Sequence, residues 1–599
     1  MKKSLSKINP VFALILAAYC GLGIYGIKFY QYQINPDGIS YIAIAEKYLA
    51  GNFADAVNGY WMPLYSWLLA PFLALGIFPL LAVKILALII GLPTLIGARW
   101  LASRFALAEL TKNILLLALI PLMIFFAFNR ISPDFLIVGV LIFYLAAVFD
   151  PNYANGKYAK GLLCGALGSL AYLAKGYGLP FFLTHFLIFN GLLYFTATAR
   201  IEKKNVFKNF ASGLIVFFII SGAWIFLISQ KYGHLTFNTA AGYNYALLEA
   251  GDLFHNRALL APPNATAASY WEDPSFVDVK RFANRQAAAR KSPHDTANQS
   301  GEVSKKIAPP KNEANHIADK LLGLFKKTAL LKRNLAPTLA IFSAISGFAF
   351  VILLAALWFC RPWRREKLRS SIFYALLTLA IYSFGYMLIA VEDRYFWIAA
   401  ILLMMIAAHF FDALFKLKNS FLHGAATVAM SAVVMFSFWK APADFLLHKK
   451  DTSRHHYKLS QKLKSEYDIH GNIASDLNWS RTLYLAYFNG YKYYGVTGHE
   501  GRDQSILRQL EENNIAYYFV WSDTSEFYVP FKEITGGQIH GLRIYNLQER
   551  DHLAAPGGEI GVKKKPAVRA SALAPFSCCA GRLPASAMLT SIIRPRQRI

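Results

Sequence analysis

The chain has 599 residues, of which 55% are hydrophobic and 15% aromatic, and its mean hydropathy is +0.34. Soluble domains are about 45–50% apolar, so this composition excludes an ordinary soluble protein and indicates many membrane spans. Lysine and arginine outnumber aspartate and glutamate by 62 to 35, a formal net charge of +27. Much of this excess lies in short loops between apolar segments, where it sets membrane orientation. With no nucleic-acid-binding motif visible, we predict membrane lipids and no nucleic acid as partners.

Eleven apolar segments are close to the length that crosses a bilayer as a helix, about 17 to 25 residues. The first follows a basic N-terminus but is long enough to span, so we predict an uncleaved helix instead of a signal peptide. The predicted spans are residues 11–30, 79–98, 113–128, 134–149, 161–174, 178–198, 210–229, 337–360, 372–390, 396–414 and 421–439.

The loops between the predicted spans alternate in charge. RPWRREKLR (361–369) is strongly basic, whereas NRISPD (129–134) and VEDRY (391–395) are not. The positive-inside rule places basic loops and the N-terminus in the cytoplasm. It therefore places the less basic loops, including NPDG (35–38), on the extracytoplasmic face, and the odd number of spans places everything after residue 440 there too.

Two polar regions and a tail complete the predicted organisation. Residues 231–335 form a long extracytoplasmic insertion within the transmembrane domain 1–440, and 286–315 has too few large apolar residues to fold. Residues 450–548 combine β-rich segments (491–496, 515–521, 542–547) with a helical one (502–512), which indicates a small extracytoplasmic α/β domain. The tail 551–599 is rich in Ala, Pro and Arg and is predicted to be disordered.

The first extracytoplasmic loop, with a helical segment over 36–78, contains the strongest candidate for a site. Asp37 directly follows the first span, where a charge is costly to bury. It precedes an apolar periodic segment and could act as a helix N-cap, a role compatible with reactivity. Tyr41, Trp61 and Tyr65 in the same loop are residue types that favour the membrane interface or contact a sugar or acceptor.

A second acid and three cations lie on the same predicted face. Asp134 begins the fourth span and could also be an N-cap, whereas Lys175, Arg394 and Arg130 lie near span ends, where snorkelling would explain each one alone. Together the five residues suit a phosphate held near an acidic base. The acids could instead bind a divalent cation, or act as a base and a group that orients it.

Three other charged or titratable residues have simpler interpretations. Glu392 and Asp393 could pair with the neighbouring arginine. His185, inside the sixth span, is more typical of a hydrogen-bonded core residue than of a ligand.

Two stretches of the first loop, PDGISYIAIAEKYLAGNF (36–53) and PLYSWLLAPF (63–72), resemble that loop in GT-C membrane glycosyltransferases. The similarity is to family 39, which is protein O-mannosyltransferase-like, and to the lipid A aminoarabinose transferase type. SPDFL (132–136), YLAKGYGLPFF (172–182) and RYF (394–396) are partial matches. The family often has a second acid directly after the first, whereas Gly38 follows Asp37 here.

This resemblance implies a polytopic α-helical membrane protein that moves a sugar, with inversion, from a polyprenyl-phosphate donor to a lipid, glycan or protein acceptor on the outer face. Asp37 would be the base or a metal ligand and Asp134 the second acid, and a divalent cation is the only cofactor that the resemblance suggests. Lys175 and Arg394, with Arg130, would bind the donor phosphate.

Two other functions remain open from the sequence. A transporter or flippase of lipid-linked sugars would need broken helices and polar residues near the bilayer midplane, and Lys84 is the clearest intramembrane charge. A non-catalytic envelope assembly protein would use its C-terminal domain to bind a partner, but eleven spans are more than anchoring needs.

Overall fold

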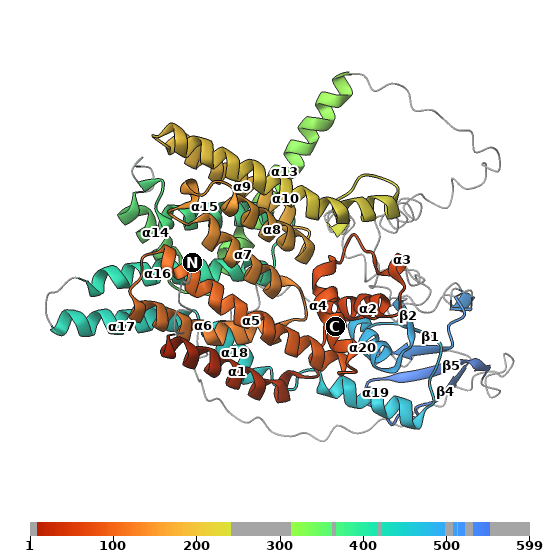
Figure 1. The fold of residues 1–599 in the computed structure, drawn as a ribbon. Coiled ribbons are helices and arrows are strands. Elements are labelled where there is room, and N and C mark those ends of the chain that lie inside the picture. Colours follow the sequence, from red (N-terminus) through yellow and green to blue (C-terminus); the bar gives the residue numbers. More distant parts are fainter. Residues whose placement is uncertain are drawn as a thin grey trace.

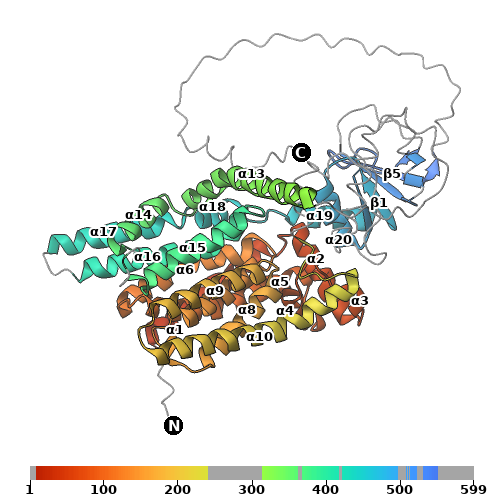
Figure 2. The same cartoon turned by 90° about the horizontal axis from the view of Figure 1, so that it is seen from above.

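The computed structural model describes residues 9–240, 313–361, 364, 367–416, 421–496, 507–508, 510–511, 513–521 and 531–550. It consists of a bundle of long apolar helices with a small mixed sheet at one end (Figures 1 and 2). Most of the predicted insertion 231–335, its segment 286–312 and the predicted tail 551–599 lie outside these residues. The last part of the insertion, from residue 313 onward, is helical.

A helix occupies each of the eleven predicted spans, which confirms a polytopic helical membrane protein. Six described helices are long and apolar enough to cross a membrane: α1 (Pro10–Tyr30), α5 (Pro79–Arg104), α6 (Glu109–Asn129), α9 (Gly178–Thr196), α10 (Arg200–Tyr232) and α16 (Trp397–Phe415) with the short turn η4 (Asp393–Phe396) before it. Three are shorter: α7 (Asp134–Val148), α8 (Ala159–Ala174) and α15 (Ser371–Met387). The other two are bent pairs, which raise the number of long spans to at most eight.

The predicted continuous span over 337–360 is wrong, because the chain breaks within it. Helix α13 (Glu313–Ile345) passes through Pro337, and the chain then turns by 94° into α14 (Ala349–Cys360). A second bend of 55° separates α17 (Phe421–Ser437) from α18 (Lys440–His448). The hydroxyls of Ser346 and Ser437, one at each break, are 2.5 Å apart. The two breaks therefore contact and support each other.

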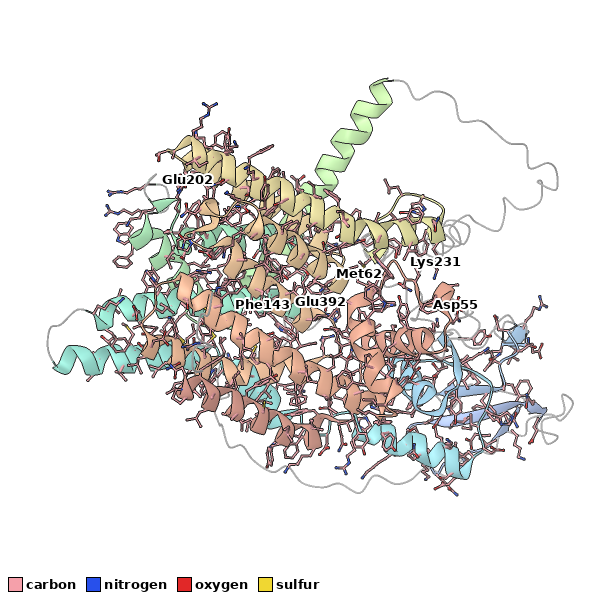
Figure 3. All side chains as sticks on the ribbon, in the orientation of Figure 1. Asp55, Met62, Phe143, Glu202, Lys231 and Glu392 are labelled. Carbon is pink, nitrogen blue, oxygen red and sulfur yellow. The ribbon has the colours of Figure 1, made fainter. Side chains whose placement is uncertain are left out.

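Ion pairs hold together the helix ends that carry the basic loops. Arg104, at the end of α5, is 3.0 Å from Asp150, which follows α7. Arg369, before α15, is 2.5 Å from Glu202 in the first turn of α10. In Figure 3, Glu202 lies far from Glu392 along the bundle. These pairs stabilise the end of the bundle opposite to the first loop.

The predicted first-loop helix 36–78 is divided into three helices: α2 (Pro36–Leu49), α3 (Phe53–Ala56) and α4 (Pro63–Ala74). The structure differs from the predicted cap, because Asn35 occupies the N-cap position and Asp37 lies in the first turn. Pro36 explains the difference, since proline suits the first helical position. Likewise Pro133, not Asp134, is the N-cap residue of α7.

The C-terminal domain is an α/β unit, as predicted. Its five-stranded sheet has the order β2-β1-β3-β5-β4, with β1 parallel to β2 and β3, and β5 antiparallel to β3 and β4. The strands are β1 (Asn472–Ser475), β2 (Lys492–Val496), β3 (Tyr517–Val520), β4 (Phe531–Glu533) and β5 (Arg543–Arg550), and the helices are α19 (Arg454–Glu466) and α20 (Trp479–Asn489). The predicted strands correspond to β2, β3 and β5. The short strands β1 and β4 and both helices were not predicted, and most of the predicted helix 502–512 lies outside the described residues.

Candidate active site

Aromatic contacts attach the C-terminal domain to the bundle. Tyr457 of α19 stacks on Tyr32 with ring centroids 4.6 Å apart, and it lies edge-on to Phe78 at 6.4 Å. The backbone N–H of Asp451 donates to the carbonyl of Phe29 at 2.9 Å. Helix α20 packs against α2, and Figures 1 and 2 show the two side by side. The domain therefore forms one wall of the region around the first loop.

Arg394 joins the two predicted acids. Its Nη1 atom is 2.5 Å from Asp37 Oδ2, and its Nε atom is 3.6 Å from Asp134 Oδ2. Lys175 Nζ donates a hydrogen bond to Asp134 Oδ1. Two acids and two cations, placed by α2, by α7, by the turn after α8 and by η4, thus form one network that we call the charge cluster.

The two acids of the charge cluster differ in exposure. The side chain of Asp134 is 3% exposed, whereas that of Asp37 is 28% exposed. A buried carboxylate is tolerated when it is paired and hydrogen-bonded, and Ser132 Oγ donates a further hydrogen bond to Asp134 at 2.8 Å. Asp134 is therefore suited to hold the cations in place, and Asp37 is the acid that a substrate can reach.

Glu392 adds a third carboxylate, which the sequence analysis treated only as a partner for Arg394. Its Oε2 atom is 2.8 Å from Arg394 Nε, and its Oε1 atom accepts a hydrogen bond from Tyr395 Oη at 3.1 Å. Arg394 Nη2 donates a hydrogen bond to Glu392 Oε1 at 3.4 Å, whereas Arg394 Nε has no oxygen in hydrogen-bonding geometry among the described residues. The cluster then contains three acids and two cations.

Lys175 lies on a stack of tyrosine rings that sequence reasoning missed. Its Nζ atom is 3.7 Å from the centroid of Tyr395, a cation–π contact. Tyr395 stacks on Tyr386 at 4.6 Å, and Tyr386 stacks on Tyr177 at 3.8 Å. Burial lowers the pKa of the Lys175 ammonium, the Asp134 charge opposes this, and the Arg394 charge lowers the pKa further. The rings thus fix the position of a cation that has little water around it.

The predicted sugar or acceptor contacts Tyr41, Trp61 and Tyr65 are buried, with exposures of 4%, 6% and 2%. The ring of Tyr41 meets the other two edge-on, at 5.3 and 5.2 Å. A stacking contact with a sugar needs an open ring face, which these rings do not offer. The geometry instead indicates that the three rings support α2 and hold Asp37 in position.

Arg130 does not join the charge cluster, contrary to its predicted place beside Lys175. The charges that act most strongly on Lys175 are those of Asp134, Arg394 and Glu392. Arg130 is exposed and forms no ion pair among the described residues. It follows the last residue of α6 and precedes the loop that contacts α2.

Gly38 occupies the position at which the GT-C enzymes that the first loop resembles often have a second acid. The side chain of Ile131, which packs against Gly38, explains why there is no side chain at this position. A Cβ atom at Gly38 would lie 2.7 Å from Ile131 Cβ, well inside the distance of about 3.5–4.0 Å at which carbon atoms pack. Asp37 therefore has no second acid beside it, because the first turn of α2 packs too closely against residue 131.

Replacing Gly38 by alanine is expected to destabilise the protein by about 1–3 kcal/mol, because the added methyl group overpacks this contact. Thermal unfolding of the purified protein in detergent measures the effect. Gly191→Ala in α9 is the matched control, since no atom lies within 4 Å of its added Cβ. Unchanged stability of Gly38→Ala would contradict the packing argument.

A divalent cation does not fit the predicted ligands Asp37 and Asp134. Arg394 contacts both carboxylates and takes the place of a bridging ion. No group of three or more His, Cys, Asp or Glu that could hold a metal ion occurs within the described ranges. The carboxylate oxygens of Asp37 and Asp134 belong to an ion-pair network, and the proposed reaction uses no metal.

Two polar residues, His185 and Lys84, are buried within the membrane helices. His185 is a hydrogen-bonded core residue, as predicted, with Nδ1 at 2.8 Å from Tyr144 Oη and Nε2 at 2.9 Å from Thr378 Oγ1. Lys84 is fully buried in α5, and its Nζ atom has no hydrogen-bond partner in the described part of the chain. It lies in the second turn of α5, close to the end of the helix.

Comparison with known proteins identifies the fold. The structure is similar to the crystal structure of ArnT from Cupriavidus metallidurans bound to undecaprenyl phosphate, with a TM-score of 0.51 at 12% identity, over 91% of this chain and 99% of that one. The chain has the GT-C type of fold. No protein-family model matches the sequence, and no curated protein matches it.

Two further structures have TM-scores below 0.5, so the fold assignment rests on the first. ArnT from Cupriavidus metallidurans in the apo state scores 0.48 at 13% identity, over 89% of this chain and 97% of that one. The archaeal oligosaccharyltransferase AglB from Archaeoglobus fulgidus, in complex with an inhibitory peptide and a dolichol-phosphate, scores 0.49 at 11% identity, over 86% and 70%.

Proposed function

We propose that this chain is an integral membrane glycosyltransferase that moves a sugar from a polyprenyl-phosphate donor to a lipid, glycan or protein acceptor on the extracytoplasmic face. The observation that carries the proposal is the charge cluster, in which Arg394 joins Asp37 to Asp134 and Lys175. A fold shared with ArnT, which was crystallised with undecaprenyl phosphate, supports it. A site at helix ends suits a donor whose phosphate lies at the headgroups and whose tail lies in hydrocarbon.

Lys175 and Arg394 are the proposed ligands of the donor phosphate. Arg394 contacts Asp37 through one oxygen atom, at 2.5 Å, and a phosphate can accept two hydrogen bonds from its guanidinium. Donor binding would therefore draw Arg394 away from Asp37. Asp37 then becomes a free carboxylate beside the reacting sugar.

The proposed reaction is a single displacement at the anomeric carbon. The acceptor oxygen forms a bond to this carbon as the bond to the phosphate oxygen breaks, and the acceptor proton passes to Asp37. The leaving polyprenyl phosphate gains one negative charge, which Lys175 and Arg394 stabilise. Asp134, which is buried, and Glu392, which is partly exposed, hold the two cations and touch no reacting atom.

Transfer by the purified protein tests the proposal. The protein is placed in nanodiscs with a panel of radiolabelled polyprenyl-phosphate sugars and with membrane extract as the acceptor source. We expect one donor to be consumed, with the label moving to an acceptor. A panel in which no donor binds or reacts would contradict the proposal.

Two observations fit the transporter alternative, namely the break between α13 and α14 and the buried charge of Lys84. Against it, the charge cluster is at the ends of the helices and does not follow a path across them. Proteoliposomes with a fluorescent lipid-linked sugar separate the two functions, since a flippase moves the lipid between leaflets without breaking the sugar–phosphate bond.

A further inference from the structure

Two lysines from distant parts of the chain lie over one aromatic ring at the end of α1. The Nζ atom of Lys28 is 4.7 Å from the ring centroid of Phe29, and the Nζ atom of Lys450 is 5.0 Å from the same centroid. Lys28 Nζ is also 3.7 Å from the ring centroid of Tyr25, which packs edge-on against Phe29. Because both lysines contact one ring, their ammonium groups are close neighbours.

The backbone and a second cation–π contact hold the link between α18 and α19 against the end of α1. Lys450 precedes Asp451, whose backbone N–H donates to the carbonyl of Phe29 at 2.9 Å. The guanidinium of Arg454, in the first turn of α19, is 5.9 Å from the ring centroid of Tyr32. The place of Lys450 beside α1 is therefore fixed by contacts on both sides of it.

The two lysines have no acidic partner in the part of the chain that the structure describes. Neither Lys28 nor Lys450 forms an ion pair there, and the acid next to Lys450, Asp451, pairs with Arg454 at 3.5 Å. Both lysines are exposed. Neighbouring ammonium groups repel each other, and an anion that contacts both offsets the repulsion. A phosphate suits this position, because its oxygens can accept hydrogen bonds from two lysines at once.

An exposed apolar face of α1 leads to this pair of cations. Leu14, Leu22 and Tyr25 are 68%, 53% and 59% exposed, and their spacing places them on the same face as Phe29. Figure 1 shows α1 at the edge of the bundle. An exposed apolar face of a membrane-spanning helix contacts the acyl chains of lipids. The cations thus lie at one end of a surface that lipid tails cover.

Two simpler explanations account for only part of this arrangement. Snorkelling explains a single lysine at the end of a span, and therefore Lys28, but Lys450 reaches the same ring from another element. The positive-inside rule would place basic residues on the opposite side of the membrane. Nevertheless, residues 440–466, on the predicted extracytoplasmic side, contain seven lysines and arginines and three acids. A local anionic partner explains both observations.

We propose that Lys28 and Lys450 bind the phosphate of an anionic phospholipid of the surrounding bilayer, with an acyl chain of this lipid along the exposed face of α1. The site goes beyond the proposed function, because none of its residues belongs to the charge cluster and the lipid is not consumed. Lys28 belongs to the bundle and Lys450 to the link into the C-terminal domain. The bound lipid therefore joins the two parts of the protein.

Native mass spectrometry of the full-length protein in detergent micelles measures the binding of single lipids. Dioleoyl phosphatidylglycerol is compared with dioleoyl phosphatidylethanolamine, which has the same phosphate but also an ammonium group that the lysines repel. We expect phosphatidylglycerol to bind about 10-fold more tightly. Equal affinity for the two lipids would overturn the proposal. Inorganic phosphate has no acyl chain and should not displace phosphatidylglycerol, and displacement at equal concentration would show a site for free phosphate instead.

Point variants assign the lipid to the two lysines. Lys28→Gln and Lys450→Gln should each weaken phosphatidylglycerol by about 5-fold, and the double variant by about 25-fold, the effect of about one lysine each at an anionic lipid. Lys458→Gln/Lys464→Gln is the matched control, since it removes the same charge from exposed positions of α19, and it should keep wild-type affinity. An equal loss in this control would overturn the proposal, because it would show only a general attraction to a basic domain.

Thermal unfolding adds a second measurement to the same set of proteins. A lipid that binds only the folded protein stabilises it, so phosphatidylglycerol should raise the Tm of the wild type and not that of Lys28→Gln/Lys450→Gln. Lys28→Arg/Lys450→Arg keeps both charges and should keep the rise. The Tm values without lipid show that the variants are folded. A rise in the Gln double variant equal to that of the wild type would contradict the assignment, and none of these measurements depends on a sugar donor.

Discussion

Replacing Asp37 by asparagine is expected to lower the turnover number for sugar transfer by about 100-fold or more, the contribution typical of a general base. Asparagine keeps the shape of the side chain but cannot take the acceptor proton. Binding of undecaprenyl phosphate should be retained, or become tighter, because Arg394 no longer has Asp37 as a competing partner. Transfer from a labelled donor and donor affinity are measured on the same preparation.

Asp55→Asn is the matched control for this experiment. Asp55 lies in the same loop and accepts a hydrogen bond from Asn52 Nδ2 at 2.6 Å, and Figure 3 shows it at a distance from Glu392. The control should transfer sugar at the wild-type rate. Full activity in Asp37→Asn would remove this acid from the mechanism.

Replacing Asp134 by asparagine is expected to cost on the order of 3–5 kcal/mol of stability, because it leaves buried cations without their partner. Asp134 is 3% exposed and pairs with Lys175, which is 19% exposed, and with Arg394, which is 10% exposed. Thermal unfolding in detergent measures the loss. Asp444→Asn is the control, since that acid pairs with His448 with both side chains at least 70% exposed, and exposed pairs contribute little.

The double variant Asp134→Asn/Lys175→Met separates stability from donor binding. Removing both members of the pair should recover much of the stability, because no charge at that point is left buried alone. Affinity for undecaprenyl phosphate should stay low, since one phosphate ligand is missing. A double variant that is as unstable as Asp134→Asn would show that the pair with Lys175 is not the source of the cost.

The first loop contacts both the membrane helices and the C-terminal domain. In the proposed reaction the membrane helices supply the charges that act on the donor, and α20 packs against α2, the helix that carries Asp37. The aromatic contacts of Tyr457 with Tyr32 and Phe78 keep these parts together.

The sequence predicts the helical membrane architecture and four of the five residues of the charge cluster. Hydrophobicity over about 20 residues is a local property, so a helix could be predicted at each of the eleven positions. Charges at the ends of spans are costly to bury and are therefore candidates for a functional role. On this ground the sequence predicts Asp37, Asp134, Lys175 and Arg394. The breaks after α13 and α17 could not, since contacts between distant hydroxyls support them.

Which of these charged residues form ion pairs depends on the tertiary structure. Asp37 and Arg394 are 357 positions apart in the chain, and no local sequence pattern predicts that they form an ion pair whereas Arg130 forms none among the described residues. The buried aromatic rings around Tyr41 and the tyrosine stack under Lys175 depend in the same way on packing between separate elements. Gly38 is explained only by Ile131, because the space for a side chain is a property of the folded chain.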